Sequence, residues 1–336
     1  MVRPRQHRDR GRQTLARQGR DAHVDHDHRG LPRRLGRRRP PAPPLRETPG
    51  LTATGLRRRR GAPDTRGVPT PKVIATDLDG TLLGPGGLLS ERNQKALQTA
   101  REHGVLTVAV TARPPRAVYR VPELAGVLDA ALCCTGAIRY DPATRAADLR
   151  HPIPTPVARD LYERLRAALP GAVFAVETGE RQIAQSPALQ EGVHLGDPWT
   201  LLDPDEDLIG AAEAVAELIV RVPGSTGTAM SERTRHIRAP GVSLWHWGSF
   251  PEIECTAAEA NKGAALAAWC AERGIGPADA VAFGDMPNDV SMLAWAGRSF
   301  AMGRAHPEAV AAATDRAEDA AEDGVARAIE TLLGTA

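Results

Sequence analysis

Large aromatic side chains are scarce in this chain of 336 residues. Phe, Trp and Tyr make up 4% of it, whereas 42% of all residues are hydrophobic. A folded core must therefore consist mainly of Ala, Val, Leu and Ile. No run of about 18 apolar residues occurs, which argues against a membrane span. The N-terminus also lacks the apolar segment of a secretory signal, so we expect a cytoplasmic protein.

Cysteine is rarer still. The four cysteines are Cys133, Cys134, Cys255 and Cys270, and no two of them are arranged as Cys-x-x-Cys. This pattern argues against a zinc site and against a disulfide framework. We expect buried free thiols in a reducing compartment.

The net charge of +2 averages two unlike parts of the chain. Residues 1–70 contain 19 Arg, no Lys and six acidic residues, a net charge of +13, and the remaining chain therefore has a net charge of −11. An acidic body argues against nucleic acid as the main ligand. A small phosphorylated ligand is compatible with it, because a bound divalent cation can reverse the local field.

Residues 1–70 are rich in Arg, Pro, Gly and His and contain few large apolar side chains. Such a segment cannot bury enough surface to offset its chain entropy, so we predict a disordered arm. It is either a basic arm that touches nucleic acid or acidic lipid, or a tail without a role, including one produced by a start codon assigned too far upstream. The composition favours the tail, and a chain that lacks residues 1–68 is expected to keep its activity.

Strands and helices are predicted to alternate from residue 72 onward. Ser90 is a candidate N-cap, and Gly104 a candidate stop, for a helix over residues 91–103. The alternation of strands and helices predicts right-handed crossovers and a Rossmann-like α/β fold, which is a parallel sheet with helices on both faces. The predicted strands cover residues 73–76, 105–110, 130–134, 280–283 and 299–302, and further helices begin near Pro114 and cover residues 261–273 and 291–296.

Residues 141–256 interrupt this rhythm with mixed helix and strand candidates. We predict an inserted α/β cap domain there, and a catalytic core made of residues 71–140 and 257–336. The candidate elements of the insert cover residues 157–168, 173–176, 213–221 and 243–247. Candidate substrate contacts in it, which the sequence does not separate from fold or surface residues, are Glu180, Arg181, His194, Trp245, His246 and Ser249.

Polar residues follow three of the predicted core strands. Asp77 and Asp79 follow the first strand, Thr111 follows the second, and Asp285 follows the strand over residues 280–283. Ligands of open parallel sheets collect beyond the carboxyl ends of the strands. We therefore expect these side chains to converge, although they lie far apart in the sequence.

Asp77 and Asp79 lie two positions apart, so they share a side-chain direction if the first strand extends through them. One carboxylate could attack phosphorus and form an aspartyl-phosphate, while the other gives a proton to the leaving oxygen. Gly80 allows a sharp turn, and Thr81 offers a hydroxyl or amide to phosphate oxygens. The alternative for so short a motif is an ordinary acidic turn after a strand.

Three further candidates carry oxygen or positive charge. Gly284-Asp285-Met286-Pro287-Asn288-Asp289 holds three oxygen-bearing side chains, which suit magnesium but also suit a capped helix N-terminus. Thr111 could donate to a phosphate oxygen beside the N–H groups of the following turn, or simply end a strand. Lys262 could supply compact positive charge, or be a solvated lysine at a helix start.

Together these residues resemble the four motifs of the haloacid dehalogenase superfamily of phosphohydrolases. The motifs occur in order as Asp77-Leu78-Asp79-Gly80-Thr81-Leu82, Thr111-Ala112-Arg113, Lys262-Gly263 and Gly284-Asp285-Met286-Pro287-Asn288-Asp289. The long insert, with Glu252-Ile253-Glu254 shortly before Lys262, is similar to the Cof-like subfamily with its α/β cap. The resemblance covers about residues 72–334, and four motifs in order are a specific signal.

The resemblance implies a magnesium-dependent phosphatase. Asp77 would be the nucleophile and a metal ligand, Asp79 the acid/base and a ligand through its backbone carbonyl, and Asp285 a further metal ligand. The cap would close over the leaving group, exclude water and select the substrate. The phosphoryl group would be bound by Thr81, Thr111, Ala112, Lys262 and Asn288, with Asp289 in support.

Two positions depart from the family pattern. Ala112 stands where the second motif commonly has Gly, and Ala is tolerated there unless φ is positive. Thr135 stands where Asn is frequent, in Thr135-Gly136-Ala137, which puts in doubt an amide contact to substrate or phosphate. Neither change removes a group that the chemistry requires.

The favoured function is hydrolysis of a small phosphorylated metabolite: a sugar phosphate, a phosphorylated cofactor or a nucleotide. A phosphomutase would instead pass the phosphoryl group to a second hydroxyl, and the cap would decide between the two. A non-catalytic protein that binds phosphate ligands is expected to lack Asp77, Asp79 or Asp285, and none of them is missing. Nucleic-acid binding would depend on the basic arm alone. The sequence predicts neither the individual substrate nor the oligomeric state.

Overall fold

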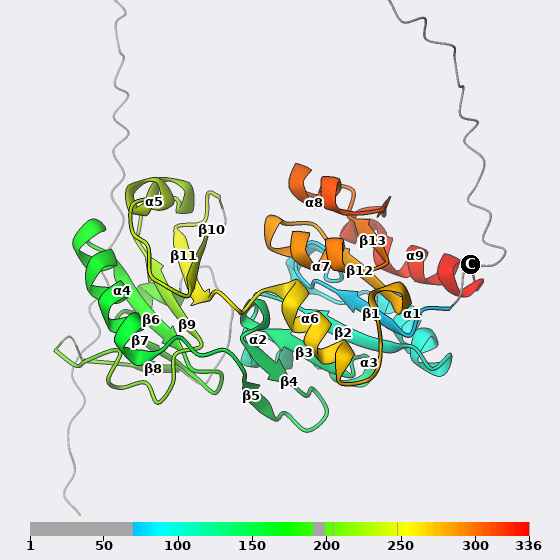
Figure 1. Cartoon of the computed structure of the whole chain (residues 1–336), viewed down its shortest axis with the longest axis horizontal. Helices are drawn as coiled ribbons and strands as arrows, with labels where there is room; N and C mark the ends of the chain where they lie inside the picture. The colour runs from blue at the N-terminus through cyan, green and yellow to red at the C-terminus, as the bar shows by residue number, and fades with distance from the viewer. Residues whose placement is uncertain (1–69, 191–198, 204, 247, 336) are drawn as a thin grey trace, which may run out of the picture. The chain divides into compact units, whose positions relative to one another are not determined.

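The structure, a computed structural model, describes residues 70–190, 199–203, 205–246 and 248–335. The predicted arm therefore lies outside the described residues, apart from Thr70, and so does His194. Within the described ranges, no helix combines the length and the apolar character that crossing a membrane requires. These ranges contain two β-sheets and their helices (Figure 1).

The larger sheet contains the strands on either side of the insert. Its members are β1 (Val73–Thr76), β2 (Leu106–Val110), β3 (Ala130–Cys133), β4 (Ile138–Tyr140), β5 (Ala147–Leu149), β12 (Ala280–Gly284), β13 (Arg298–Ala301) and β14 (Asp315–Arg316). Their order in space is β14-β13-β12-β1-β2-β3-β4-β5. The strands from β14 to β3 are parallel, whereas β4 and β5 pair antiparallel at one edge. The Rossmann-like α/β fold is confirmed, with this antiparallel extension added.

Helices cover both faces of this sheet. Side chains of β1 alternate between the faces: Ile74 belongs to one buried cluster, and Val73 and Ala75 belong to another. The Ile74 cluster includes side chains from α1 (Glu91–Glu102), α3 (Glu123–Val127) and α9 (Gly324–Leu333). The other cluster includes side chains from α6 (Lys262–Ala271), α7 (Val290–Trp295) and α8 (Pro307–Ala312). The four cysteines are buried and free.

Polar caps determine where two of these helices begin. Ser90 accepts a hydrogen bond of 3.0 Å from the Asn93 N–H and starts α1. Asn261 accepts one of 2.8 Å from the Ala264 N–H and starts α6. Caps of this kind typically contribute about 1 kcal/mol to stability. The cap on α6 makes Lys262 the first residue of the helix, so its position relative to the sheet is well defined.

The smaller sheet lies within the insert. Its strands are β6 (Val173–Glu177), β7 (Gln182–Ala184), β8 (Trp199–Leu201), β9 (Glu217–Arg221), β10 (Val242–His246) and β11 (Glu252–Ala257). Their order is β10-β11-β9-β6-β7-β8. Helices α4 (Thr155–Ala168) and α5 (Gly227–Thr234) contact β9 and β11 respectively. The insert thus has mixed α/β content.

The junction between the two sheets differs from the boundary at residue 141 that the sequence suggested. Strand β5 pairs with β4 and belongs to the larger sheet. Strands β4 and β5 are joined by a tight turn in which Asp141 Oδ1 accepts a 2.8 Å hydrogen bond from the Ala143 N–H. A hairpin extends a sheet without an intervening helix, so the rhythm of helices and strands did not reveal it. The chain enters the smaller sheet only after Leu149.

Candidate functional site

Three neighbouring strands of the larger sheet end in polar residues. Asp77 follows β1, Thr111 follows β2, and Asp285 follows β12. Since the three strands are parallel, their carboxyl ends lie at the same edge of the sheet. Asp77 and Thr111 line one pocket together with Lys262 and Asn288. Residues from both sides of the insert thus meet at this edge.

Lys262 is a buried cation between two carboxylates. Its Nζ lies 2.6 Å from Asp77 Oδ1 and 2.5 Å from Asp289 Oδ1, and the residue is 1% exposed. Burial alone would lower the pKa of Lys262, but the charges of Asp289 and Asp77 outweigh burial and raise it. Lys262 is therefore a fixed positive charge beside Asp77.

Three carboxylates crowd this end of the pocket. Asp77, Asp285 and Asp289 offer oxygens that all lie within 4.8 Å of one another. Burial, together with the charge of Asp289, raises the pKa of Asp285 to about 6. Burial also raises the pKa of Asp77, although Lys262 opposes the shift. Hard oxygen donors in this number suit a divalent cation such as magnesium, whose charge would relieve the repulsion, so the residues present fit a metal ion.

Hydrogen bonds fix the orientation of these carboxylates. Asp289 Oδ2 accepts the N–H groups of Asp285 and Met286, each at 2.9 Å. Thr81 donates its hydroxyl to Asp285 Oδ1 at 3.3 Å. The sequence suggested Thr81 as a phosphate contact, but the structure buries this side chain and directs it to Asp285. Thr81 is thus placed to position a carboxylate.

The chain turns sharply between Asp77 and Asp79. Strand β1 ends at Thr76, so Asp77 and Asp79 do not continue it, although both line the pocket. Asp77 is 5% exposed, whereas the side chain of Asp79 is 60% exposed. Gly80 makes the turn with a φ of +77°, and a Cβ there would lie 2.5 Å from Asp285 Oδ2.

Asp79 is held by Arg113 in a two-point ion pair. Arg113 Nε donates to Asp79 Oδ2 at 2.7 Å, and Nη2 donates to Oδ1 at 2.6 Å. Burial would lower the pKa of Arg113, but the hydrogen bonds and the charge of Asp79 raise it. The sequence placed Arg113 in the second motif without a role, and the structure gives it this contact.

The remaining motif residues lie beside Asp77. Thr111 Oγ1 accepts the Arg113 N–H at 3.0 Å, and Ala112 lines the pocket without a positive φ. Asn288 Oδ1 is buried and has no hydrogen-bond partner among the described residues. An unsatisfied amide that lines a pocket is suited to a polar ligand. Thr135 is buried and is not among the residues that line the pocket.

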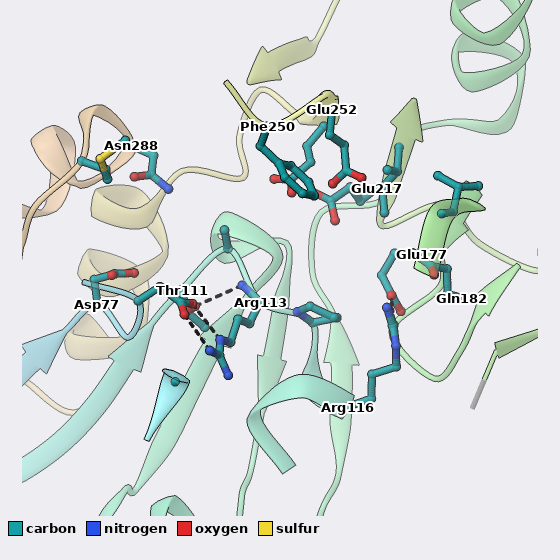
Figure 2. Close-up of a pocket in the computed structure, with 18 of the residues that line it drawn as sticks. Asp77, Thr111, Arg113, Arg116, Glu177, Gln182, Glu217, Phe250, Glu252 and Asn288 are labelled. Atoms are coloured by element: carbon teal, nitrogen blue, oxygen red, sulfur yellow. Dashed lines mark hydrogen bonds and ion pairs between the residues drawn. The ribbon is translucent and has the colours of Figure 1, made fainter. Parts of the chain in front are cut away.

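The pocket has a volume of about 620 Å³ and is lined by residues of both sheets. Figure 2 shows Asp77, Thr111 and Arg113 toward one side, and Glu177 and Gln182 toward the other. The smaller sheet contributes charged residues of β6, β9 and β11 to this lining.

Sequence patterns did not identify this second group of lining residues. The candidates predicted within the described part of the insert do not line the pocket: Glu180, Arg181, Trp245, His246 and Ser249. A signal was nevertheless present, because Glu217 and Arg221 flank Leu218-Ile219-Val220 in one five-residue strand that is buried throughout. A charged residue inside a fully buried strand needs a partner or a ligand.

Comparison with known proteins gives consistent results. Residues 74–329 match the sequence profile of the haloacid dehalogenase-like hydrolases. Pyridoxal phosphate phosphatase YbhA of Escherichia coli K12 is 27% identical over 274 residues, covering 79% of this chain and 99% of that protein. The HMP-PP phosphatase of Shigella flexneri is 27% identical over 246 residues, covering 70% of this chain and 86% of that protein.

A solved structure shares the fold. The crystal structure of a haloacid dehalogenase-like hydrolase from Bacteroides thetaiotaomicron matches with a TM-score of 0.67 and 24% identity, covering 78% of this chain and 99% of that chain. The profile match spans both parts of the larger sheet and the insert between them. The chain belongs to the haloacid dehalogenase superfamily of hydrolases, as a Cof-like member.

Proposed function

We propose that this chain is a phosphatase that hydrolyses a phosphate monoester of a small metabolite through an aspartyl-phosphate at Asp77. The observation that carries the proposal is the placement of Asp77, buried at the end of β1, in contact with Lys262 and clustered with Asp285 and Asp289. Two relatives are named as phosphatases, one of them for pyridoxal phosphate. Sugar phosphates, phosphorylated cofactors and nucleotides are the candidate substrates.

Two carboxyl groups divide the chemistry. Asp77 attacks phosphorus, and the bond between phosphorus and the ester oxygen breaks. Asp79 gives a proton to that oxygen, and then takes one from the water that hydrolyses the aspartyl-phosphate. Arg113 occupies both carboxyl oxygens of Asp79, so this contact has to break before Asp79 can reach the ester oxygen.

The phosphoryl group is bound by the positive and polar residues beside Asp77. Lys262, Thr111 and Asn288 contact its oxygens in this proposal, and the buried position of Lys262 keeps water away from that contact. Magnesium is the proposed cofactor, with Asp77 and Asp285 as side-chain ligands, Asp289 in support and the Asp79 carbonyl as a further ligand. When bound, this ion supplies additional positive charge to the phosphoryl oxygens.

The test is phosphate release from an aryl phosphate ester in the presence of magnesium. Asp77→Asn is expected to lower kcat by about 10³-fold or more, because the amide of Asn cannot act as the nucleophile in place of a carboxylate. Asp160→Asn is the matched control, since Asp160 is exposed and, in the described part of the chain, forms its ion pair with Arg164 of the same helix. Turnover retained in Asp77→Asn would contradict the mechanism. Transfer to an added alcohol without phosphate release would identify a phosphomutase.

Asp79→Asn tests the acid role separately. The variant is expected to lose more activity on alkyl esters, whose leaving oxygen needs a proton, than on activated aryl esters, whose leaving oxygen does not. The measurement is kcat/KM for a series of esters that differ in the acidity of the alcohol. An equal loss across the series would rule out Asp79 as the acid.

A further inference from the structure

One face of the smaller sheet presents carboxylates to the pocket. Alternate residues of a strand point to the same face, and Glu217 and Ile219 of β9 both line the pocket. Glu177 of β6 lies directly opposite Glu217 in the pairing of the two strands. Glu254 of β11 lies opposite Ile219. Like charges placed this way destabilise a sheet, so the arrangement needs a reason other than folding.

Two of the carboxylates on this face are neutralised by arginines. Arg116 forms a buried ion pair with Glu177. Arg221 donates from Nε and Nη2 to Glu252 Oε2, at 3.0 and 2.6 Å. Each guanidinium thus neutralises a carboxylate.

Glu217 has no such match. It is 3% exposed, and its Oε1 is buried without a hydrogen-bond partner in the described part of the chain. None of the ion pairs among the described residues includes Glu217. Burial, and then the charges of Glu254 and Glu177, raise the pKa of Glu217 well above its ordinary value. Binding of a ligand that donates a hydrogen bond to this buried carboxyl is therefore favourable.

The lining of the pocket therefore has two ends of opposite character. Lys262 lies at one end, where the proposed function places the phosphate. At the other end, the described lining contains the carboxyl groups of Glu177, Glu217, Glu252 and Glu254 together with the guanidinium groups of Arg116 and Arg221. Apolar contact surface next to these carboxyl groups comes from Ile219, Leu189 and Phe250.

We propose that Glu217 binds a protonated nitrogen on the organic part of the substrate, so that the substrate is a phosphate monoester of a small, nitrogen-containing alcohol. This inference rests on the proposed phosphatase function and extends it to the leaving group. A hydroxyl group could satisfy the hydrogen bond, but a protonated nitrogen also brings the positive charge that favours ionisation of Glu217 beside Glu177. The carbon skeleton of the alcohol packs against the apolar residues between the two ends.

Three related esters test this proposal: para-aminomethylbenzyl, para-hydroxymethylbenzyl and para-methylbenzyl phosphate. They share a benzylic leaving oxygen and differ only in the group that reaches the smaller sheet. We expect kcat/KM for the amine to exceed that for the methyl compound by about tenfold or more, with the hydroxyl compound between them. Glu217→Gln should lower the amine-to-methyl ratio by about tenfold.

Glu213→Gln is the matched control, because Glu213 is exposed, close by in sequence and absent from the pocket lining. It should leave the amine-to-methyl ratio unchanged. A wild-type preference for the hydroxyl compound, or an unchanged ratio in Glu217→Gln, would overturn the proposal. If Glu217→Gln does not fold, inhibition of the wild type decides instead: para-aminomethylbenzyl alcohol must inhibit more strongly than para-methylbenzyl alcohol.

A binding measurement distinguishes an error in this inference from an error in the proposed function. Asp77→Asn keeps the smaller sheet intact, and calorimetric titration of that variant compares the amine and methyl esters without turnover. Tighter binding of the amine ester supports the role of Glu217 even if no ester is hydrolysed by the wild type. Equal binding of the two contradicts it even if both are hydrolysed.

Discussion

Gly80 is a single residue on which the metal-binding cluster depends. Glycine is needed at this position for two separate reasons. Its φ is +77°, and a Cβ there would lie only 2.5 Å from Asp285 Oδ2. Gly80→Ala is expected to displace Asp285 and to weaken magnesium binding by about tenfold or more, measured by calorimetric titration.

Gly171 provides the control for the contribution of backbone strain. It has a φ of +78°, and a Cβ there would meet nothing within 4 Å. Gly171→Ala should therefore lose about 1 kcal/mol of stability from the left-handed conformation and keep its magnesium affinity. Equal loss of magnesium affinity in the two variants would mean that the contact with Asp285 is irrelevant.

Glu217 gives a residue-scale prediction that needs no substrate. Its pKa is raised in the folded protein, so the folded state keeps a proton that the unfolded chain has released above about pH 4.5. Stability is therefore lost as the pH rises above that value. Glu217→Gln cannot lose a proton, and its thermal unfolding midpoint should exceed that of the wild type by about 3 °C or more at pH 8.

Scanning calorimetry at two pH values checks this prediction. The advantage of Glu217→Gln should shrink toward pH 5, where the wild-type carboxyl is protonated in the folded state, and Glu213→Gln should show no such trend. An advantage of equal size at both values would mean that the effect is not the titration of Glu217.

At the scale of the element, local signals were sufficient for the longer helices and strands of both sheets and insufficient for the shortest strands. The apolar run at residues 73–76 and the cap Ser90 predicted β1 and α1 within a few residues, and the helix predicted over residues 261–273 is observed as α6. The hairpin of β4 and β5 was missed, because strands of three residues carry too little pattern.

The position of each lining residue relative to its strand explains which of them the sequence revealed. Asp77, Thr111 and Asp285 each follow an apolar strand, and that position is visible in the sequence. Glu177 is the last residue of β6 and Glu217 is the first residue of β9, and a charged residue that belongs to a strand ordinarily indicates the solvent face. Only the long-range pairing of β6 with β9 puts them on a buried face, and single-sequence patterns do not specify such pairing.

Helices α6 and α7 meet at Gly263. A Cβ there would lie 2.4 Å from the Ser291 carbonyl oxygen, and the Gly263 N–H donates to Ser291 Oγ at 3.0 Å. Gly263→Ala should push α6 away from α7 and move the adjacent Lys262 relative to Asp77. We expect a loss of about 1–3 kcal/mol in the free energy of unfolding, measured in urea, and a lower kcat.

Gly276→Ala is the corresponding control, since Gly276 has a φ of −94° and a Cβ there would meet nothing within 4 Å. Its stability and kcat should match those of the wild type. A Gly263→Ala variant with wild-type kcat would show that the contact of the two helices does not position Lys262.

At the scale of the whole molecule, metal binding and folding are expected to be coupled. A ligand that binds only the folded chain stabilises it by about 2.7 kcal/mol at a concentration of 100 Kd. Magnesium should therefore raise the thermal unfolding midpoint of the wild type and have little effect on Asp285→Asn, with Asp160→Asn behaving like the wild type. A midpoint that magnesium leaves unchanged in the wild type would contradict the proposed metal site.

The strand order of the larger sheet also has a consequence for how the protein is made. Asp77 and Lys262 touch, yet they are 185 residues apart, and β1 pairs with both β2 and β12. During synthesis on the ribosome, β1 and β2 emerge early. One edge of β1 then remains without its partner β12 until the entire insert has been synthesised. Translation that stops anywhere in the insert yields no partially active enzyme, only a fragment with an open strand edge, which is a substrate for chaperones and proteases.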